Sequence, residues 1–430
     1  MKSVKSVAAR LAVGDTKISG SIMADTSGAN ARMQAAPLPS FSFDRGPAVI
    51  CAVIFAAVAL VIAQAVSLHQ MVVYLIGGVL GLALYHASFG FTGGWRRMVV
   101  ERRGRAMRAQ LLMVGVAAIA FMPLLAFGSP FGTSLVGALA PVGVSVLVGA
   151  LLFGFGMQLG GGCGSGTLFT AGGGSARMLV TLAFFVVGAL LGTAHLPMWL
   201  TLPSIPPVGL GSVLGPVGGI IVTLVALAGV ALLTVIVERR AHGALELVSP
   251  PSRRGIARFL HGPWPLVGTG LLLALMNVVT LLVTGHPWSI TFGFGVWGAK
   301  IAQAVGVGVE NWAFWTWPGP ARALQNSVLA DDTSVMNFGI IIGAALASAL
   351  AGKFAPKVRV PLASLIAAAI GGVLMGYGAR LAFGCNIGAL FSGIASGSLH
   401  GWLWFVAAFV GSALGIAVRP IFGLDGFKKK

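Results

Sequence analysis

Charged residues are scarce in this sequence. Only 9% of the 430 residues are Asp, Glu, Lys or Arg, whereas 57% are hydrophobic. A soluble domain carries about 25% charged residues, so this composition excludes an ordinary water-soluble fold. Several apolar runs are long enough to cross a hydrocarbon layer, which takes about 20 helical residues. We therefore predict an all-α polytopic integral membrane protein.

Acidic residues are the scarcest charges. Asp and Glu number 10 against 28 Lys and Arg, which gives a net charge of +18. The basic residues cluster in short loops between apolar runs, at 96–108, 239–258 and 353–359. This is the positive-inside pattern, which places those loops in the cytoplasm and argues against a nucleic-acid partner. The rarity of carboxylates in the apolar runs also disfavours a proton relay.

Cysteine is rare as well. Cys51, Cys163 and Cys385 are far apart and form no C-x-x-C pair, which excludes a disulfide framework and a zinc or redox motif of that kind. We therefore expect no metal site and no cofactor. The start of the chain is polar and lacks an apolar run, so residues 1–45 are predicted to form a disordered cytoplasmic tail rather than a cleaved signal.

The apolar runs predict eleven membrane helices. They lie at about 47–67, 70–87, 110–128, 133–157, 178–195, 216–237, 265–284, 288–308, 338–352, 360–380 and 400–418. The longest polar connection divides the chain into a first membrane repeat at 46–238, a cytoplasmic linker at 239–262 and a second membrane repeat at 263–418. A basic tail follows at 419–430.

The two halves share a motif. GALLFGFGMQLGGGCGSGTLF, from Gly149, aligns without gaps with GGVLMGYGARLAFGCNIGALF, from Gly371, at an offset of 222 residues. Of the 21 positions, 10 are identical, and they include the two cysteines, which a bias toward Gly and Leu does not place in register. The pattern indicates an internal duplication.

The basic loops give the two copies opposite directions. Helices traced from the basic loop at 96–108 bring the first motif to the cytoplasmic face, and helices traced from the loop at 353–359 bring the second motif to the other face. This predicts two inverted repeats. The tracing requires that one apolar segment between 285 and 352 does not cross, and the Trp-rich run from Trp297 to Trp317 is the candidate.

The glycines of the motifs predict broken helices. Each glycine in a helix interior costs about 1 kcal/mol relative to alanine, so the run Gly160, Gly161 and Gly162 should interrupt its helix. Unwound backbone at membrane depth must be buried in protein or line a wet cavity. We therefore expect short discontinuous or re-entrant helices around a central path, with thiols, hydroxyls and backbone amides facing that path.

The same motifs supply candidate anion ligands. A helix that restarts after a break offers free N–H groups and partial positive charge, which favour an anion, and paired thiols favour an anion that contains sulfur. The amides of Gly162, Gly164 and Gly384 are expected to donate hydrogen bonds. Arg380 lies off the basic loops, and an arginine inside the membrane is a functional candidate by default. The predicted substrate-binding residues are Cys163, Cys385, Arg380, Gln158, Gly162, Gly164, Ser165, Thr167, Gly384 and Asn386.

Other interpretations of these residues stay open. Glycines in membrane helices often permit close packing, Arg380 could snorkel to the interface, and Cys51 is expected to pack as a small hydrophobic residue. A membrane-embedded, thiol-dependent sulfurtransferase would use Cys385 as its nucleophile, although no general base stands in either motif. A scaffold subunit would not need matched cysteines.

Three stretches resemble the signatures of a known family. GFGMQLGGGCGSGT, GYGARLAFGCNIGALFSGIASGSLHGW and SFGFTGGWRR are similar to segments of the YeeE/YedE-type sulfur transporters. The resemblance implies a multi-pass protein of the bacterial inner membrane, associated with thiosulfate uptake, whose hourglass-like helical fold is pinched by short helices and loops. It also implies that Cys163 and Cys385 pass the anion along by S–H···S contacts. Family members often have a further cysteine where this chain has Gly90.

Residues and resemblance together predict a transporter rather than an enzyme, with the sulfurtransferase as the alternative. The expected substrate is a small sulfur-containing anion, above all thiosulfate, taken up through a cysteine-lined constriction. The expected partners are membrane lipid and a small soluble sulfur-carrier protein on the cytoplasmic side.

Overall fold

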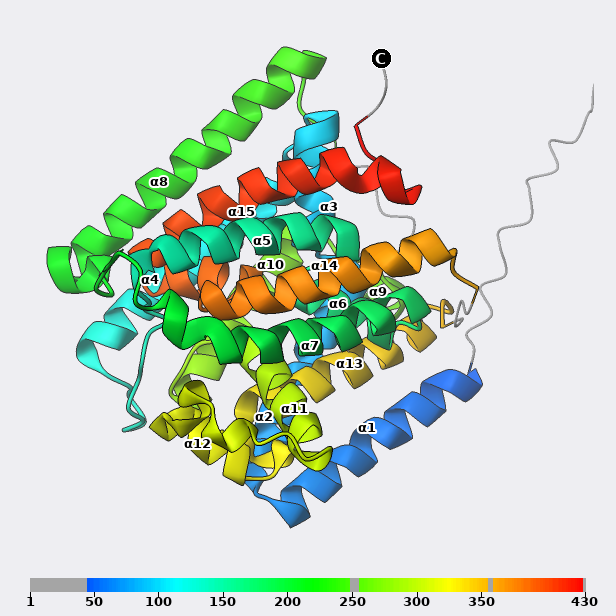
Figure 1. Cartoon of the computed structure of the whole chain (residues 1–430). Coiled ribbons are helices and arrows are strands. Elements are labelled where there is room, and N and C mark those ends of the chain that lie inside the picture. The colour runs from blue at the N-terminus through cyan, green and yellow to red at the C-terminus, as the bar shows by residue number, and fades with distance from the viewer. Residues whose placement is uncertain (1–44, 248–254, 355–358, 428–430) are drawn as a thin grey trace, which may run out of the picture. The chain divides into compact units, whose positions relative to one another are not determined.

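The computed structural model describes residues 45–247, 255–354 and 359–427, which all belong to one compact unit. The predicted disordered tail lies outside these residues apart from Arg45, as do residues 248–254 of the predicted linker and the last three lysines. Helices make up almost all of the regular structure in the described ranges, which confirms the all-α prediction (Figure 1).

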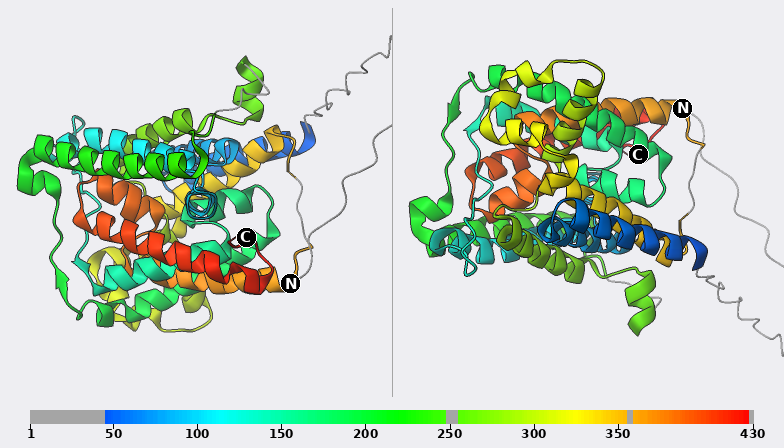
Figure 2. Two further views of the ribbon diagram at one scale, coloured as in Figure 1. Left: turned by 90° about the horizontal axis from the view of Figure 1, so that it is seen from above. Right: turned by 90° about the horizontal axis from the view of Figure 1, so that it is seen from below.

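Each predicted membrane segment overlaps one of the longer helices. These are α1 (Arg45–Ala65), α2 (Leu68–Ala87), α4 (Arg105–Phe127), α5 (Val144–Gly160), α7 (Ala176–Trp199), α8 (Leu210–His242, kinked at Gly215), α10 (Leu266–Thr284), α11 (Thr291–Ala304), α13 (Asp332–Leu350), α14 (Leu362–Leu381) and α15 (Leu399–Val418). The prediction of helix for residues 133–143 was wrong, because they form a loop and the strand β1 (Val142–Gly143) before α5. Figure 2 shows α1 running beside α13 at the edge of this unit.

Short elements join the long helices. They are α3 (Phe91–Arg96), α6 (Gly164–Gly172), α9 (Gly255–His261) and α12 (Pro318–Gln325), the π-helical segments η1 (Arg97–Glu101) and η5 (Asn386–Gly393), and the 3₁₀ turns η2 (Val309–Asn311), η3 (Ala313–Thr316), η4 (Val328–Ala330) and η6 (Arg419–Phe422). The strands β1 (Val142–Gly143) and β2 (Ser204–Ile205) form a two-residue antiparallel ladder between loops.

The number of crossings agrees with the sequence argument. Within the described ranges, 10 helical stretches are long and apolar enough to cross a membrane. The predicted helix at 288–308 is not among them, because α11 has 14 residues and spans about 21 Å, short of a hydrocarbon layer of about 30 Å. The Trp-rich run from Trp297 to Trp317 comprises the end of α11 and the turns η2 and η3, and it stops just before α12. The length of α11 agrees with the prediction that one apolar segment in this region does not cross, which stays a prediction.

The 222-residue offset holds for the structure as well as for the sequence. Moving α5, α6 and α7 forward by this offset places them on α14, η5 and α15. Gly149 packs on Gly378 while Gly156 packs on Gly371, so α5 and α14 run antiparallel. The two copies of the motif therefore enter the core in opposite directions, as inverted repeats do.

Several motif glycines serve helix packing rather than the breaks. A Cβ on Gly154 would collide with the carbonyl oxygen of Ala408 in α15, and a Cβ on Gly376 would collide with that of Phe185 in α7. Small residues at such crossings let backbones approach closely in membrane proteins. The packing interpretation thus explains the glycines within α5 and α14, whereas those that follow each helix need a separate explanation.

Part of the basic loop before α4 is tied to a buried carboxylate. Glu238 of α8 is fully buried and accepts hydrogen bonds from Arg103 at 3.3 Å and from Arg108 at 2.8 Å. The backbone amides of Gly104 and Glu246 donate to the same carboxylate at 3.1 and 2.8 Å. A buried charge needs such complete pairing. Glu238 therefore fastens α8 to the start of α4.

Candidate functional site

The first tip is the break between α5 and α6, residues 160–167. Gly161 has a left-handed conformation with φ of 88°, which glycine adopts at little cost. Cys163 is the N-cap residue of α6, and its Sγ lies 3.5 Å from Ser165 Oγ. Ser165 and Thr167 are fully buried, and the Thr167 hydroxyl has no hydrogen-bond partner among the described residues. The break thus presents a thiol and two hydroxyls at the start of a short helix.

The second tip is the break between α14 and η5, residues 382–386. Phe383 has φ of 55° and Gly384 has φ of 149°, values in the left-handed half of the map that a regular helix does not reach. Cys385 is the N-cap residue of η5, and its Sγ accepts a hydrogen bond from the Ile387 amide at 3.4 Å. Both breaks place a cysteine directly before the first turn of a short helix, which confirms the predicted discontinuous helices.

Asn386 stands out in the second tip. It is fully buried, and within the described part of the chain neither Oδ1 nor Nδ2 of its side chain has a hydrogen-bond partner. Leaving a buried polar group unpaired costs about 1–3 kcal/mol, so native proteins rarely do so without a reason. The unpaired amide therefore stays a candidate ligand group, as predicted.

The two tips meet in the core. A Cβ placed on Gly164 would lie 3.1 Å from Cys385 Sγ and 3.5 Å from Ile290 Cγ2. Cys163 is 1% exposed and Cys385 is 0% exposed, so the thiols are closed off from solvent in this conformation. Both thiols are thus buried at the start of α6, since Cys385 Sγ lies by Gly164 and Cys163 Sγ lies 3.4 Å from a Cβ on Gly166, and the unpaired Asn386 follows Cys385 directly in the chain.

The three predicted amide donors differ in their availability. The amide of Gly384 donates to the carbonyl oxygen of Ala379 at 2.8 Å. Contrary to the prediction, this amide is therefore already paired and not free to bind an anion. Gly164 occupies the first position of α6, where backbone N–H groups have no partner within the helix. Gly162 lies outside both helices and lines a cavity described below.

Arg380 is held by two aromatic rings and a backbone carbonyl. Its guanidinium lies 4.9 Å from the ring centre of Phe314 and 5.6 Å from that of Phe292, and its Nη2 donates to the Thr291 carbonyl oxygen at 3.4 Å. Stacking on aromatic faces stabilises a guanidinium. Arg380 therefore packs against α11 and η3, and among the described residues no hydrogen bond joins it to either cysteine.

Gln158, the repeat counterpart of Arg380, has a different environment. It is fully buried, and its Nε2 donates to Ser412 Oγ at 2.7 Å and to the Thr92 carbonyl oxygen at 3.2 Å. Through Thr92 it joins α5 to α3. The two members of the pair thus hold different neighbouring segments.

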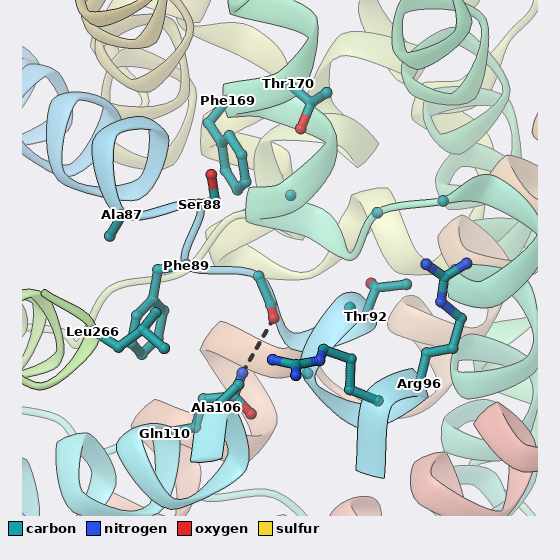
Figure 3. A pocket seen from close by; sticks show the side chains of 17 residues that line it. Ala87, Ser88, Phe89, Thr92, Arg96, Ala106, Gln110, Phe169, Thr170 and Leu266 are labelled. Carbon is teal, nitrogen blue, oxygen red and sulfur yellow. Dashed lines mark hydrogen bonds between the residues drawn. The ribbon is translucent and has the colours of Figure 1, made fainter. Parts of the chain in front are cut away.

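One cavity opens beside the first tip. It has a volume of about 410 Å³ and is lined by Ser88, Gly90, Thr92, Arg96, Gln110 and Gly162, among others. We call it the Arg96 pocket. Figure 3 shows the side chains of Thr92 and Arg96 in its wall, with the Gln110 amide donating to the Gly90 carbonyl oxygen. The pocket lies on the side of the basic loop at 96–108.

A second cavity lies near the second tip. It has a volume of about 530 Å³ and is lined by His286, Ser289, Phe292, Arg322, Asp331 and Asp332, among others. We call it the Asp331 pocket. Burial raises the pKa of the Asp331 carboxyl. Burial alone would lower the pKa of His286, but its hydrogen bond to Asp332, at 3.3 Å, outweighs this and raises that pKa.

Ser289 connects this pocket to the second tip, and it was not among the predicted site residues. Ser289 lines the pocket, and its Oγ would lie 3.7 Å from a Cβ on Gly388 of η5. Asn277 fixes the segment that contains Ser289, because its Oδ1 accepts from the Trp288 amide and its Nδ2 donates to Ser392 of η5. The polar residues that interrupt the apolar sequence just before α11 could have predicted a functional segment there.

The remaining cysteine has no part in this arrangement. Cys51 packs with Ala48 and Ala349 in a small apolar cluster between α1 and α13. This agrees with its expected role as a small hydrophobic residue. Among the described residues, no three His, Cys, Asp or Glu side chains are placed to hold a metal ion.

Comparisons with known proteins agree with the motifs. A family model described as sulphur transport matches residues 86–414. The thiosulfate transporter TsuA of Escherichia coli strain K12 is 26% identical over 343 residues, 78% of this chain and 90% of that relative. TsuA of Spirochaeta thermophila is 26% identical over 339 residues, 76% of this chain and 92% of that relative. The probable transporter YedE of Escherichia coli strain K12 is 32% identical over 163 residues, which span 37% of this chain and 39% of that relative's length.

These findings confirm the resemblance and favour transport over a sulfurtransferase reaction. The family match includes both tips and the wall of the Arg96 pocket. Because it spans more than half of the chain, the protein belongs to the sulphur transport family.

Proposed function

We propose that the protein carries thiosulfate, or a closely similar sulfur oxyanion, into the cell through the place where the two tips meet. The observation that most supports this is the approach of Gly164 to within 3.1 Å of Cys385 Sγ, measured from an ideal Cβ. It puts both thiol-bearing helix starts at one point. Two full-length relatives named thiosulfate transporters support the choice of ion.

The chemistry of the tips fits a thiosulfate-like ion. Its terminal sulfur is soft and accepts weak S–H contacts from Cys163 and Cys385, while its oxygens accept from the Asn386 amide and from the free N–H groups at the start of α6. Helix starts carry partial positive charge, which favours the anion. No carboxylate stands in either tip to oppose it. Ser165 and Thr167 supply hydroxyls to the same place.

Passage requires the tips to separate. With exposed fractions of 1% and 0%, the two thiols leave no opening for an ion of this size. Unwound, glycine-rich segments such as 160–162 absorb backbone rotations easily. We infer that the ion moves from the Asp331 pocket past Ser289 to the thiols and then past Gly162 into the Arg96 pocket. Arg380 and Gln158 act indirectly in this scheme, by holding the segments next to the tips.

The setting completes the proposal. The protein lies in the bacterial inner membrane with its basic loops in the cytoplasm, in agreement with the positive-inside pattern. The two repeats extend over 46–238 and 263–418, joined by the linker at 239–262. A small soluble sulfur-carrier protein receives the ion on the cytoplasmic side.

The test compares the three cysteines. Cys385→Ala and Cys163→Ala should reduce uptake of labelled thiosulfate to the rate of cells without the gene, because each removes one of the two contacts to the soft sulfur. Cys51→Ala is the matched control, since Cys51 is buried in a cluster away from both tips, and it should transport at the parental rate. Growth of a sulfur auxotroph on thiosulfate gives a second readout. Parental uptake by Cys385→Ala at equal membrane abundance would refute the role of the thiols.

A further inference from the structure

The Arg96 pocket contains an arginine without a partner. Arg96 lines the cavity, and no hydrogen bond or ion pair joins it to any other described residue. Its neighbour Arg97 is fully engaged, because it binds Glu101 and Glu246, each at 3.1 Å. In Figure 3 the guanidinium of Arg96 reaches across the wall toward the backbone of the first tip. A partly buried guanidinium without a protein partner is a candidate ligand for an anion.

Arg96 also differs from the other arginines around the end of α5. Arg177 donates to the carbonyl oxygen of Gly160 at 2.8 Å, and Arg419 donates to that of Gln158. Cations commonly satisfy the last carbonyls of a helix in this way. Arg96 satisfies no carbonyl within the described ranges, so its charge is available to a ligand.

A buried hydroxyl beside Arg96 is also unpaired. Thr92 is 7% exposed, lines the same cavity, and its Oγ1 has no hydrogen-bond partner among the residues that the structure describes. Figure 3 shows Ser88 and Thr170 bringing further hydroxyls to the wall. Gln110 holds the loop in place through its bond to the Gly90 carbonyl oxygen, at 3.2 Å. The wall therefore offers hard O–H and N–H donors and no thiol.

We propose that the Arg96 pocket is a second anion site, which holds the oxygens of a sulfur oxyanion through Arg96 and Thr92. A guanidinium and a hydroxyl bind oxygens through strong, charge-assisted hydrogen bonds and do not distinguish a terminal sulfur from a fourth oxygen. The pocket therefore accepts sulfate as well as thiosulfate, and discrimination between them lies at the thiols. The position of this site on the transport path, after the thiols, rests on the proposed function. The binding of an anion in the pocket does not.

The test places a reporter thiol in the pocket. Gly90 has φ of −120° and ψ of 134°, and no atom lies within 4 Å of an ideal Cβ there, so Gly90→Cys fits without strain. The three native cysteines are at most 8% exposed and should react slowly. We expect sulfate to slow the alkylation of Gly90→Cys by N-ethylmaleimide about threefold or more relative to chloride at equal ionic strength, because Arg96 holds the ion in front of the thiol.

Matched variants decide the outcome. Ala244→Cys places a thiol on an exposed part of the loop that contacts Arg103, outside the pocket, and its alkylation should not depend on sulfate. Adding Arg96→Gln to Gly90→Cys should remove the protection, and Arg96→Lys should retain part of it. Equal rates in sulfate and chloride, or full protection in Arg96→Gln, would overturn the proposal.

A readout on the native chain guards against a misfolded reporter. Sulfate should raise the thermal midpoint of the unmodified protein more than that of Arg96→Gln, because specific binding to the folded state adds to the general stabilisation that sulfate gives any folded protein. Equal rises in both proteins would count against the site. The two proposals fail separately, since protection by sulfate can persist when Cys385→Ala transports normally, and can be absent when the thiols prove essential.

Discussion

The two tips descend from one duplicated sequence, yet they differ in accessibility. Gly161, Gly162 and Gly166 of the first motif line the Arg96 pocket, whereas residues 382–386 of the second tip line neither of the two pockets described above. The identical positions of the motif preserve the break and the thiol. The positions that differ decide whether the break opens to a cavity or closes against the core.

The differing positions explain the contrast physically. Gly161 of the first tip is equivalent to Phe383 of the second, so the first tip has no side chain at the position where the second has an aromatic ring. Gly164 is equivalent to Asn386, so the first tip has no side chain at the position where the second has an amide without hydrogen-bond partners among the described residues. Under the proposed function, the first tip would leave room for the ion to depart, and the second would offer a group to hold it. The predictions below test this division of roles.

The largest effect is expected when the empty space of the first tip is filled. Gly164→Ala places a methyl group 3.1 Å from Cys385 Sγ, which is tighter than most real contacts. Overpacking of a core costs about 1–3 kcal/mol, and 1.4 kcal/mol corresponds to about a tenfold change in rate or binding. We expect thiosulfate uptake to fall about fivefold or more on that scale. Alanine suits a helix better than glycine, so the thermal midpoint should not fall in proportion.

Substitutions of two further glycines should reduce uptake by smaller amounts. Gly166→Ala brings a Cβ to 3.4 Å from Cys163 Sγ, and Gly388→Ala, at the same place in the second motif, brings one to 3.7 Å from Ser289 Oγ, so uptake should fall less in each. Gly229→Ala in α8 is the control, because a Cβ there meets no atom within 4 Å. Equal uptake by Gly164→Ala and Gly229→Ala would show that the tips do not form the narrow point.

A smaller effect is expected from the holding group of the second tip. Asn386→Leu removes a buried amide without hydrogen-bond partners among the described residues, so it should abolish most uptake while leaving the thermal midpoint unchanged or higher. Asn277→Leu is the matched control, because Asn277 bonds both Trp288 and Ser392, and its loss should destabilise the protein by about 1–3 kcal/mol. A large fall in the midpoint of Asn386→Leu would instead make this residue structural.

The sequence predicted the breaks because they are local. Consecutive glycines before a cysteine interrupt a helix wherever it packs, and the 222-residue offset is visible without coordinates. The direction of Arg380 could not be predicted in this way, because the aromatic rings that hold it, Phe292 and Phe314, are more than sixty residues away along the chain. Arg96 was assigned to a basic loop for the same reason. Arg96 has no partner among the described residues because the nearby carboxylates, Glu101 and Glu246, bind Arg97.

The smallest effect is expected at the Asp331 pocket, which adjoins the second tip through Ser289. The pKa of His286 is raised in the folded protein, so its contribution to stability is complete below its ordinary pKa and is lost as the pH rises through the folded value. The thermal midpoint should therefore fall as the pH rises above the ordinary histidine pKa of about 6.5, and His286→Gln should flatten this slope. Because the His286 side chain is 42% exposed, the contribution should stay below about 1 kcal/mol. His242→Gln, at the end of α8, is the control and should keep the parental slope, and an unchanged slope in His286→Gln would remove the pairing with Asp332 as its cause.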